Sequence, residues 1–151
     1  MNIRGQEFSG FRLLIDAVLV LMILVIIMGI LGWVESLRFQ MSEQRLYDGF
    51  DKAVNSPDGK VVLEKNLSIR GGIIFLTGSF ERPGIKKKCI EFDALNVGGL
   101  VLSDTKRQVE VTNNMMVDMY YKCLRNINGT NCIVECDTCC EISFGKEFVT
   151  P

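Results

Sequence analysis

The chain opens with one long apolar run and then changes to short alternating runs. From Ala17 to Val34, eighteen consecutive residues carry no charge, and the run extends back to Leu13 with Asp16 as its one interruption. As a helix, residues 13–34 would reach about 33 Å, which is long enough to cross the hydrocarbon core of a bilayer. The pattern predicts a transmembrane helix over residues 13–34, preceded by a polar leader and flank over residues 1–12.

The helical pattern continues beyond the apolar run. No proline or glycine follows Val34 until Gly49, and apolar residues keep a loose three-to-four spacing in between. Residues 56–59, Ser-Pro-Asp-Gly, have the composition of a turn. We therefore expect a helical extension over residues 35–55 that leaves the membrane and ends at this turn.

From Lys60 onward, β-branched and apolar residues form short runs separated by glycine-containing turns. The run from Arg107 to Thr112 alternates cleanly, with Val109 and Val111 on one face. The predicted strands are residues 60–69, 73–80, 86–92, 99–103 and 107–112. Residues 115–123 fit either a short helix or a strand, and the tail beyond them is expected to hold loops with one or two short strands.

These elements predict an α+β fold. A long N-terminal transmembrane helix continues into a small antiparallel β-rich domain over residues 56–151, with a disulfide-linked C-terminal region. The 151 residues leave room for one such domain beyond the helix.

The charges that flank the apolar run predict its orientation. Arg4, Arg12 and the free amino terminus face only Glu7 on one side, whereas the basic and acidic residues balance on the other. The positive-inside rule then places the N-terminus in the cytoplasm and residues 56–151 outside the cell membrane. A cleaved signal peptide is the competing interpretation, but this apolar core exceeds the usual 7–15 residues of such signals.

All six cysteines follow the apolar run, on the side where disulfides persist. Adjacent Cys139 and Cys140 cannot readily bond each other, because a trans peptide holds their Cα atoms about 3.8 Å apart. We expect two of the last four cysteines to pair with the two upstream ones. The cysteines are Cys89, Cys123, Cys132, Cys136, Cys139 and Cys140.

A metal or iron–sulfur site is the alternative for this cluster, because Cys136 and Cys139 have ligand spacing and Cys132 precedes them by four residues. The outside location and the absence of histidine argue for disulfides instead. No metal and no cofactor are therefore predicted.

Other chemistry has little support in the sequence. With no histidine, Ser-His-Asp and Cys-His catalysis are excluded, so no enzyme activity and no catalytic residue are predicted. The 17 basic and 18 acidic residues leave no electrostatic footprint for nucleic acid. Asn66-Leu67-Ser68 and Asn128-Gly129-Thr130 are glycosylation triplets on the predicted outside, so Asn66 and Asn128 are candidate modification sites.

The residues around the start of the apolar run resemble archaeal type IV pilin-like proteins with a class III signal peptide. In that family a short basic leader ends in Gly before Gln, and Arg4, Gly5, Gln6 and Leu14 match its pattern. The resemblance implies that a prepilin-type peptidase cuts between Gly5 and Gln6 on the cytoplasmic side. The usual Ser two positions after Gln is Phe8 here, and the usual Glu four positions after Gln is Gly10.

In the family, that Glu pairs with the free amino group of a neighbouring subunit. Glu7, near the new terminus, and Asp16, inside the membrane entrance, are the candidate substitutes. A carboxylate there is costly unless it is paired. Asp16 can contact a neighbouring subunit's amine, or it can pair locally with Arg12, four residues before it on the same helical face.

The sequence therefore predicts a single-pass, pilin-like structural subunit for adhesion or secretion, partnered by the membrane, the peptidase and other pilin-like subunits. It would reside in the cell membrane and, after assembly, in an extracellular filament. The alternatives are an uncleaved membrane-anchored domain that binds an extracellular ligand, and an extracytoplasmic redox or metal protein that uses Cys132, Cys136, Cys139 and Cys140.

Overall fold

The computed structural model describes residues 7–94, 97–126 and 135–148. The chain divides into two compact units, Met1–Arg38 and Phe39–Pro151. We call the second unit the head. It contains the C-terminal part of the long helix together with all the strands.

Helix α1 runs without a break from Glu7 to Asn55, over 49 residues. Many Leu, Met, Glu, Gln and Arg residues favour the helix, and no proline interrupts it. The helix ends where Pro57 follows, and Lys52 lies in its last turn, where a positive charge complements the helix dipole. The expected transmembrane segment and helical extension thus form one continuous helix.

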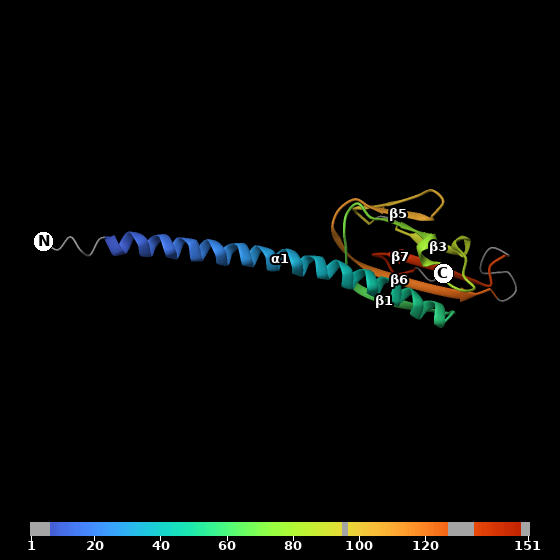
Figure 1. Ribbon diagram of the computed structural model, residues 1–151. Coiled ribbons are helices and arrows are strands. Elements are labelled where there is room, and N and C mark those ends of the chain that lie inside the picture. Colours follow the sequence, from blue (N-terminus) through green and yellow to red (C-terminus); the bar gives the residue numbers. More distant parts are fainter. Residues whose placement is uncertain (1–6, 95–96, 127–134, 149–151) are drawn as a thin grey trace. The chain divides into compact units, whose positions relative to one another are not determined.

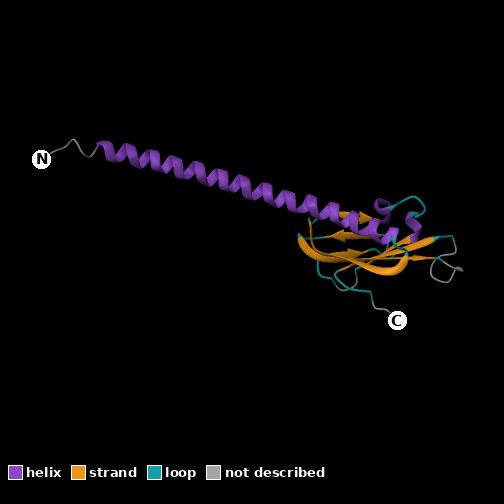
Figure 2. Cartoon of the chain, turned by 90° about the horizontal axis from the view of Figure 1, so that it is seen from below, coloured by secondary structure: helices purple, strands orange, loops and turns teal. Residues whose placement is uncertain are grey.

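The larger sheet of the head has four strands in the order β1–β6–β7–β3. β1 (Asp58–Ile69) pairs antiparallel with β6 (Met115–Arg125), and β6 pairs antiparallel with β7 (Thr138–Phe144). β3 (Ile90–Asp93) pairs with β7 in parallel. The last turns of α1 lie beside β1 and β6 (Figure 1, Figure 2).

The smaller sheet has three antiparallel strands in the order β2–β5–β4. They are β2 (Ile74–Leu76), β5 (Gln108–Val111) and β4 (Leu100–Leu102). Val109 and Val111 of β5 are fully buried, as the alternation in the sequence predicted, while Glu110 between them is exposed. The inner face of this sheet therefore completes the core of the head.

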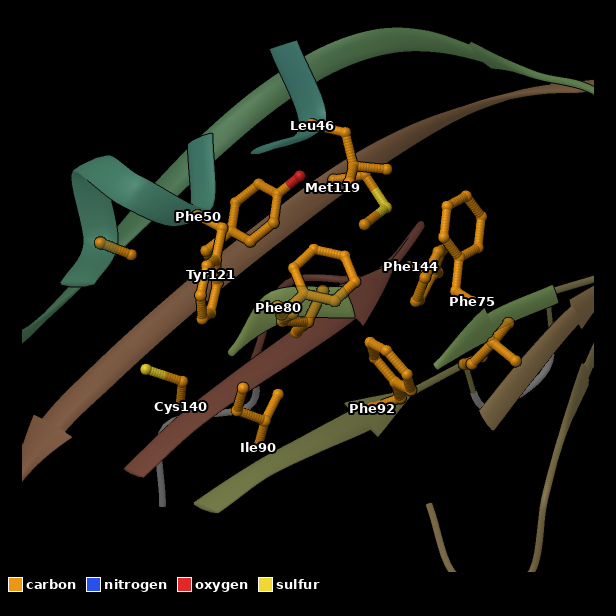
Figure 3. Close-up of a cluster of buried hydrophobic side chains, with 14 of the residues drawn as sticks. Leu46, Phe50, Phe75, Phe80, Ile90, Phe92, Met119, Tyr121, Cys140 and Phe144 are labelled. Carbon is orange, nitrogen blue, oxygen red and sulfur yellow. The ribbon is translucent and has the colours of Figure 1, made fainter. Parts of the chain in front are cut away.

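A chain of aromatic rings crosses that core from helix to sheet. Phe50 of α1 lies 5.2 Å from Phe80, which lies 5.7 Å from Phe92, and Phe92 lies 5.8 Å from Phe144 (centroid distances). Figure 3 shows these rings together with Tyr121 of β6, which is also fully buried. The C-terminal part of α1 is thus an integral wall of the core.

Two local predictions were wrong, and the predicted antiparallel pairing holds for each described strand pair except β3 and β7. Residues 77–80 form a 3₁₀ helix, η2 (Thr77–Phe80), in which Thr77 and Phe80 are both buried. In a strand, two residues three positions apart point to opposite faces, so both could not be buried on the same side. Residues 87–89 form a second one, η3 (Lys87–Cys89), directly before β3. The larger sheet is also not wholly antiparallel, since β3 and β7 run in the same direction. The ambiguous segment 115–123 is strand β6.

Candidate functional site: the apolar helix and its attachment to the head

The side chains of the apolar segment of α1, residues 13–34, are exposed on every side of the helix. Every side chain from Gly10 to Glu35 is exposed, and those of Leu13, Leu21 and Trp33 are exposed by 65% or more. A helix in a globular protein normally buries an apolar stripe, whereas this segment is apolar all round. Among the described residues, α1 is the one helix long and apolar enough to cross a membrane. This is compatible with a single-pass membrane anchor.

The polar residues predicted at the entrance of this segment lie on the first turns of α1. Arg12 and Asp16 are both exposed and occupy one face of the helix, but within the described part of the chain they form no ion pair. Glu7 is the first residue of α1. The predicted processing residues Gly5 and Gln6 lie outside the described residues.

Gly10, at the position where the sequence-based resemblance expects a glutamate, is exposed on the helix surface. A Cβ atom added at Gly10 would meet nothing within 4 Å. Asp16, six residues further along, is the next acidic residue of α1 after Glu7.

Beyond Arg38 the same helix becomes amphipathic. Ser42, Leu46, Gly49, Phe50 and Ala53 are buried against the sheets, and the residues between them are exposed or partly exposed. This three-to-four spacing places one face of the helix on the core. The change from an all-round apolar helix to an amphipathic one marks where α1 joins the head.

A salt-bridge cluster attaches α1 to β1. Glu64 accepts hydrogen bonds from Arg45 (3.1 Å) and from Lys52 (2.7 Å), and its side chain is only 12% exposed. Burial alone would raise the pKa of Glu64, but the hydrogen bonds from Lys52 and Arg45 outweigh it and hold that pKa below its usual value. The carboxylate therefore stays ionised and joins two turns of the helix to one strand.

Two further contacts strengthen the attachment. Arg82 donates to Asp51 of α1 at 2.6 Å, and its guanidinium lies 5.7 Å from the ring centre of Phe50. Closer to the apolar segment, the guanidinium of Arg70 lies 5.0 Å from the ring centre of Phe39. Arg70 and Arg82 thus bind residues of α1 from outside the helix, while Phe50 packs in the core.

α1 also covers the unpaired edge of β1. Arg45 donates to the carbonyl of Lys65 at 3.1 Å, and the Ser42 hydroxyl accepts from the backbone N–H of Ser68 at 3.0 Å. These backbone groups face away from β6 and would otherwise be open to another strand. The helix therefore satisfies part of the sheet edge as well as anchoring it.

The cysteines have the pattern that the sequence favoured. Cys136 lies at disulfide distance from Cys89 and Cys140 from Cys123, with Cα separations of 5.8 and 4.1 Å. Cys139 is disulfide-bonded as well, and Cys132 lies outside the described residues. The Cys123–Cys140 bond joins directly opposed residues of β6 and β7, and the Cys89–Cys136 bond ties the C-terminal region to η3.

The two glycosylation triplets differ in what can be said of them. Asn66 is exposed on β1, in a left-handed conformation with φ of 54°. Asn128 lies outside the described residues. Over the described ranges, no group of three or more Cys, Asp and Glu side chains is arranged to hold a metal ion.

The sequence-based reasoning missed the residues that attach the helix to the head. Arg45 and Lys52 are seven residues apart, which places them on one helix face two turns apart, and this spacing was a usable signal. Their common partner Glu64 carried no signal, because the pairing depends on how β1 lies against α1. Trp33, exposed near the end of the apolar segment, is the type of residue that concentrates at membrane interfaces.

We compared the chain with protein-family models, with curated proteins and with solved structures, and none of them matches it.

Proposed function

We propose that this protein is a single-pass membrane protein that serves as a pilin-like structural subunit of a surface filament or a secretion pseudopilus. The observation that carries the proposal is the apolar segment, which is exposed around the whole helix and continues directly into the core of the head. Support also comes from Arg4-Gly5-Gln6, the motif directly before that helix, which resembles a prepilin-type processing site.

Insertion of the apolar segment into a bilayer is favourable by its composition. Leu13–Val34 contains fifteen Leu, Ile and Val residues, each contributing roughly 0.3–0.6 kcal/mol near the middle of a membrane. Their sum of about 5–9 kcal/mol exceeds the cost of Asp16, which is about 2.5–3.5 kcal/mol at the middle of a membrane and less near the interface. The segment therefore anchors the subunit before assembly.

Assembly replaces lipid around this helix with the helices of other subunits. Cleavage after Gly5 exposes the amino group of Gln6, and Asp16 offers a carboxylate that has no ion-pair partner among the described residues. An ionised carboxylate at the hydrocarbon boundary gains most from a cationic partner. In this mechanism Asp16 receives the amino group of a neighbouring subunit, with Glu7 beside the new terminus, and so replaces the carboxylate absent at Gly10.

The head is the part that meets the surroundings. The salt bridges on Glu64 and the contact of Phe50 with Phe80 hold the C-terminal part of α1 in the head, and the described cystines fasten the C-terminal region within it. This role is structural, in adhesion or in secretion, and needs no catalytic group.

Assembly is tested with two matched substitutions at the membrane entrance. The full chain is expressed with a prepilin-type peptidase and its assembly machinery, and sheared filaments are quantified by electron microscopy and immunoblotting. We expect Asp16→Asn to reduce assembly about tenfold or more, since losing one member of a buried charge pair costs a few kcal/mol. Arg12→Gln should assemble like the unaltered chain.

Two outcomes would contradict this mechanism. Unchanged assembly of Asp16→Asn would remove Asp16 from it, and an equal loss in Arg12→Gln would show that the local Arg12–Asp16 pair is what matters.

The second candidate function is an uncleaved membrane-anchored domain that binds an extracellular partner. The observation that favours it is the departure from the family pattern at Phe8 and Gly10. It requires a chain that keeps its leader and stays single in the membrane, and the same expression experiment distinguishes the two functions.

A further inference from the structure

We propose that Asn66 is the acceptor of an N-linked glycan, which covers the unpaired edge of β1. The site is the triplet Asn66-Leu67-Ser68. The proposal rests on the membrane topology given above, because transfer takes place on the side away from the cytoplasm. The local geometry of β1 supports it.

Asn66 lies in a β-bulge. The register of β1 against β6 shifts between Glu64, which is opposite Met119, and Leu67, which is opposite Val117. Lys65 and Asn66 thus face the single residue Asp118, and a bulge of two residues against one bends the strand and turns a side chain outward. The Asn66 side chain is accordingly exposed, although Glu64 and Leu67, which flank the bulge, are paired with β6.

The backbone of Asn66 is held independently of its side chain. Its N–H donates to a carboxylate oxygen of Asp118 at 2.8 Å, and its φ of 54° is in the left-handed region that Asn tolerates better than most residues. Within the described part of the chain, no hydrogen bond engages its side-chain amide. A group attached to that amide therefore displaces no contact of the fold.

The bulge conformation accounts for an Asn at residue 66, but it does not require Ser68. The backbone N–H of Ser68 donates to Ser42, and this bond would form with any residue at position 68 except proline. The hydroxyl two residues after the Asn is what a glycan transferase needs. A substitution at Ser68 can therefore remove the acceptor triplet while it leaves the conformation of Asn66 unchanged.

The transfer is a substitution at the sugar. The side-chain nitrogen of Asn66 forms a bond to the anomeric carbon of a saccharide carried on a lipid phosphate, and the bond from that carbon to the phosphate oxygen breaks. The lipid phosphate leaves with the electron pair, and the amide gives up one proton. Because Leu67 is fully buried in the folded head, the transfer precedes the docking of β1 into the sheet.

A glycan at Asn66 protects an edge that the fold covers only in part. Arg45 and Ser42 satisfy backbone groups of Lys65 and Ser68. A hydrated saccharide beside them would prevent another strand from pairing along β1. This side of the head would consequently face solvent in any assembly.

The test uses the full chain in a host whose oligosaccharyltransferase acts outside the cytoplasm, with Asn128→Gln so that one natural triplet remains. Mass spectrometry of the tryptic peptide 66–70 reports the attached saccharide. Ser68→Ala should abolish the modification, whereas Ser68→Thr should retain it. Both variants keep Asn66 and the bulge.

A control substitution separates the glycan from the topology. Asp58→Asn together with Lys60→Thr creates a second acceptor triplet around Gly59, and residues 58 and 60 are both exposed. If this control site is modified and the peptide 66–70 is not, the proposal is wrong and the topology stands. If neither is modified, the head does not face the transferase, and the proposed topology falls together with the glycan.

Discussion

Replacing Gly49 by Ala should destabilise the head, although the same change stabilises most helices. Gly49 is buried where α1 lies closest to the larger sheet, and an added Cβ would lie 2.7 Å from Cε2 of Tyr121 and 2.8 Å from Cγ of Glu64. Neither neighbour can move aside easily, because Tyr121 is fully buried and Glu64 is held by two salt bridges.

The magnitude follows from two opposing terms. Ala in place of Gly favours a helix by about 1 kcal/mol, while overpacking of a filled core costs about 1–3 kcal/mol. With both neighbours held in place we expect the upper part of that range, hence a net loss of about 1–2 kcal/mol in the free energy of unfolding. For a unit of this size, that loss lowers Tm by roughly 4–8 °C.

The assay is thermal unfolding of the full chain in detergent micelles, followed by near-ultraviolet circular dichroism of the head's tyrosines. Gly32→Ala is the matched control, since Gly32 is exposed and a Cβ added there meets nothing within 4 Å. It should leave the Tm of the head unchanged. A Tm for Gly49→Ala equal to or above that of the unaltered chain would refute the close approach of α1 to Tyr121 and Glu64.

Three further predictions concern the core and its attachments. Since the folded pKa of Glu64 is lowered, its stabilisation is present above about pH 4.5 and is lost as the pH falls; acid titration of Tm should therefore show a smaller fall for Glu64→Gln than for the unaltered chain. Tyr121 has a buried hydroxyl with no hydrogen-bond partner among the described residues. Tyr121→Phe should therefore leave the free energy of unfolding unchanged or raise it by about 1 kcal/mol. A loss above about 1 kcal/mol in denaturant unfolding would contradict this. The Cys123–Cys140 bond closes a separation of 17 residues, and replacing both cysteines by Ser should cost about 3 kcal/mol, measured by urea unfolding, with a cost near zero counting against the bond.

The sequence was most informative where one periodicity continued over many residues. The apolar run and the absence of proline predicted α1 as one helix, and the observed helix ends at Asn55, next to the expected turn. The alternation at Val109 and Val111 likewise located β5 and its buried face. In these segments local pattern and tertiary packing agree, so the pattern alone was sufficient.

The sequence was least informative where long-range contacts decide the structure. Thr77 and Phe80 are buried together by a 3₁₀ turn, which a strand-like composition concealed. Met115 to Cys123 became a strand because β1 and β7 flank it on both sides. The parallel pairing of β3 with β7 and the choice of Glu64 as the partner of Arg45 depend on topology, which no short window of sequence contains.

The central claim is that this chain is processed as a pilin-like subunit, and its most direct test is the N-terminal residue of the protein isolated from cells. The full chain is purified from membranes of a host that contains a prepilin-type peptidase, and its N-terminal peptide is identified by mass spectrometry, with a peptidase-deficient host as the control. We predict Gln6 as the first residue in the first host and the intact leader in the second. A chain that begins at Met1 or Asn2 in both hosts would contradict the account.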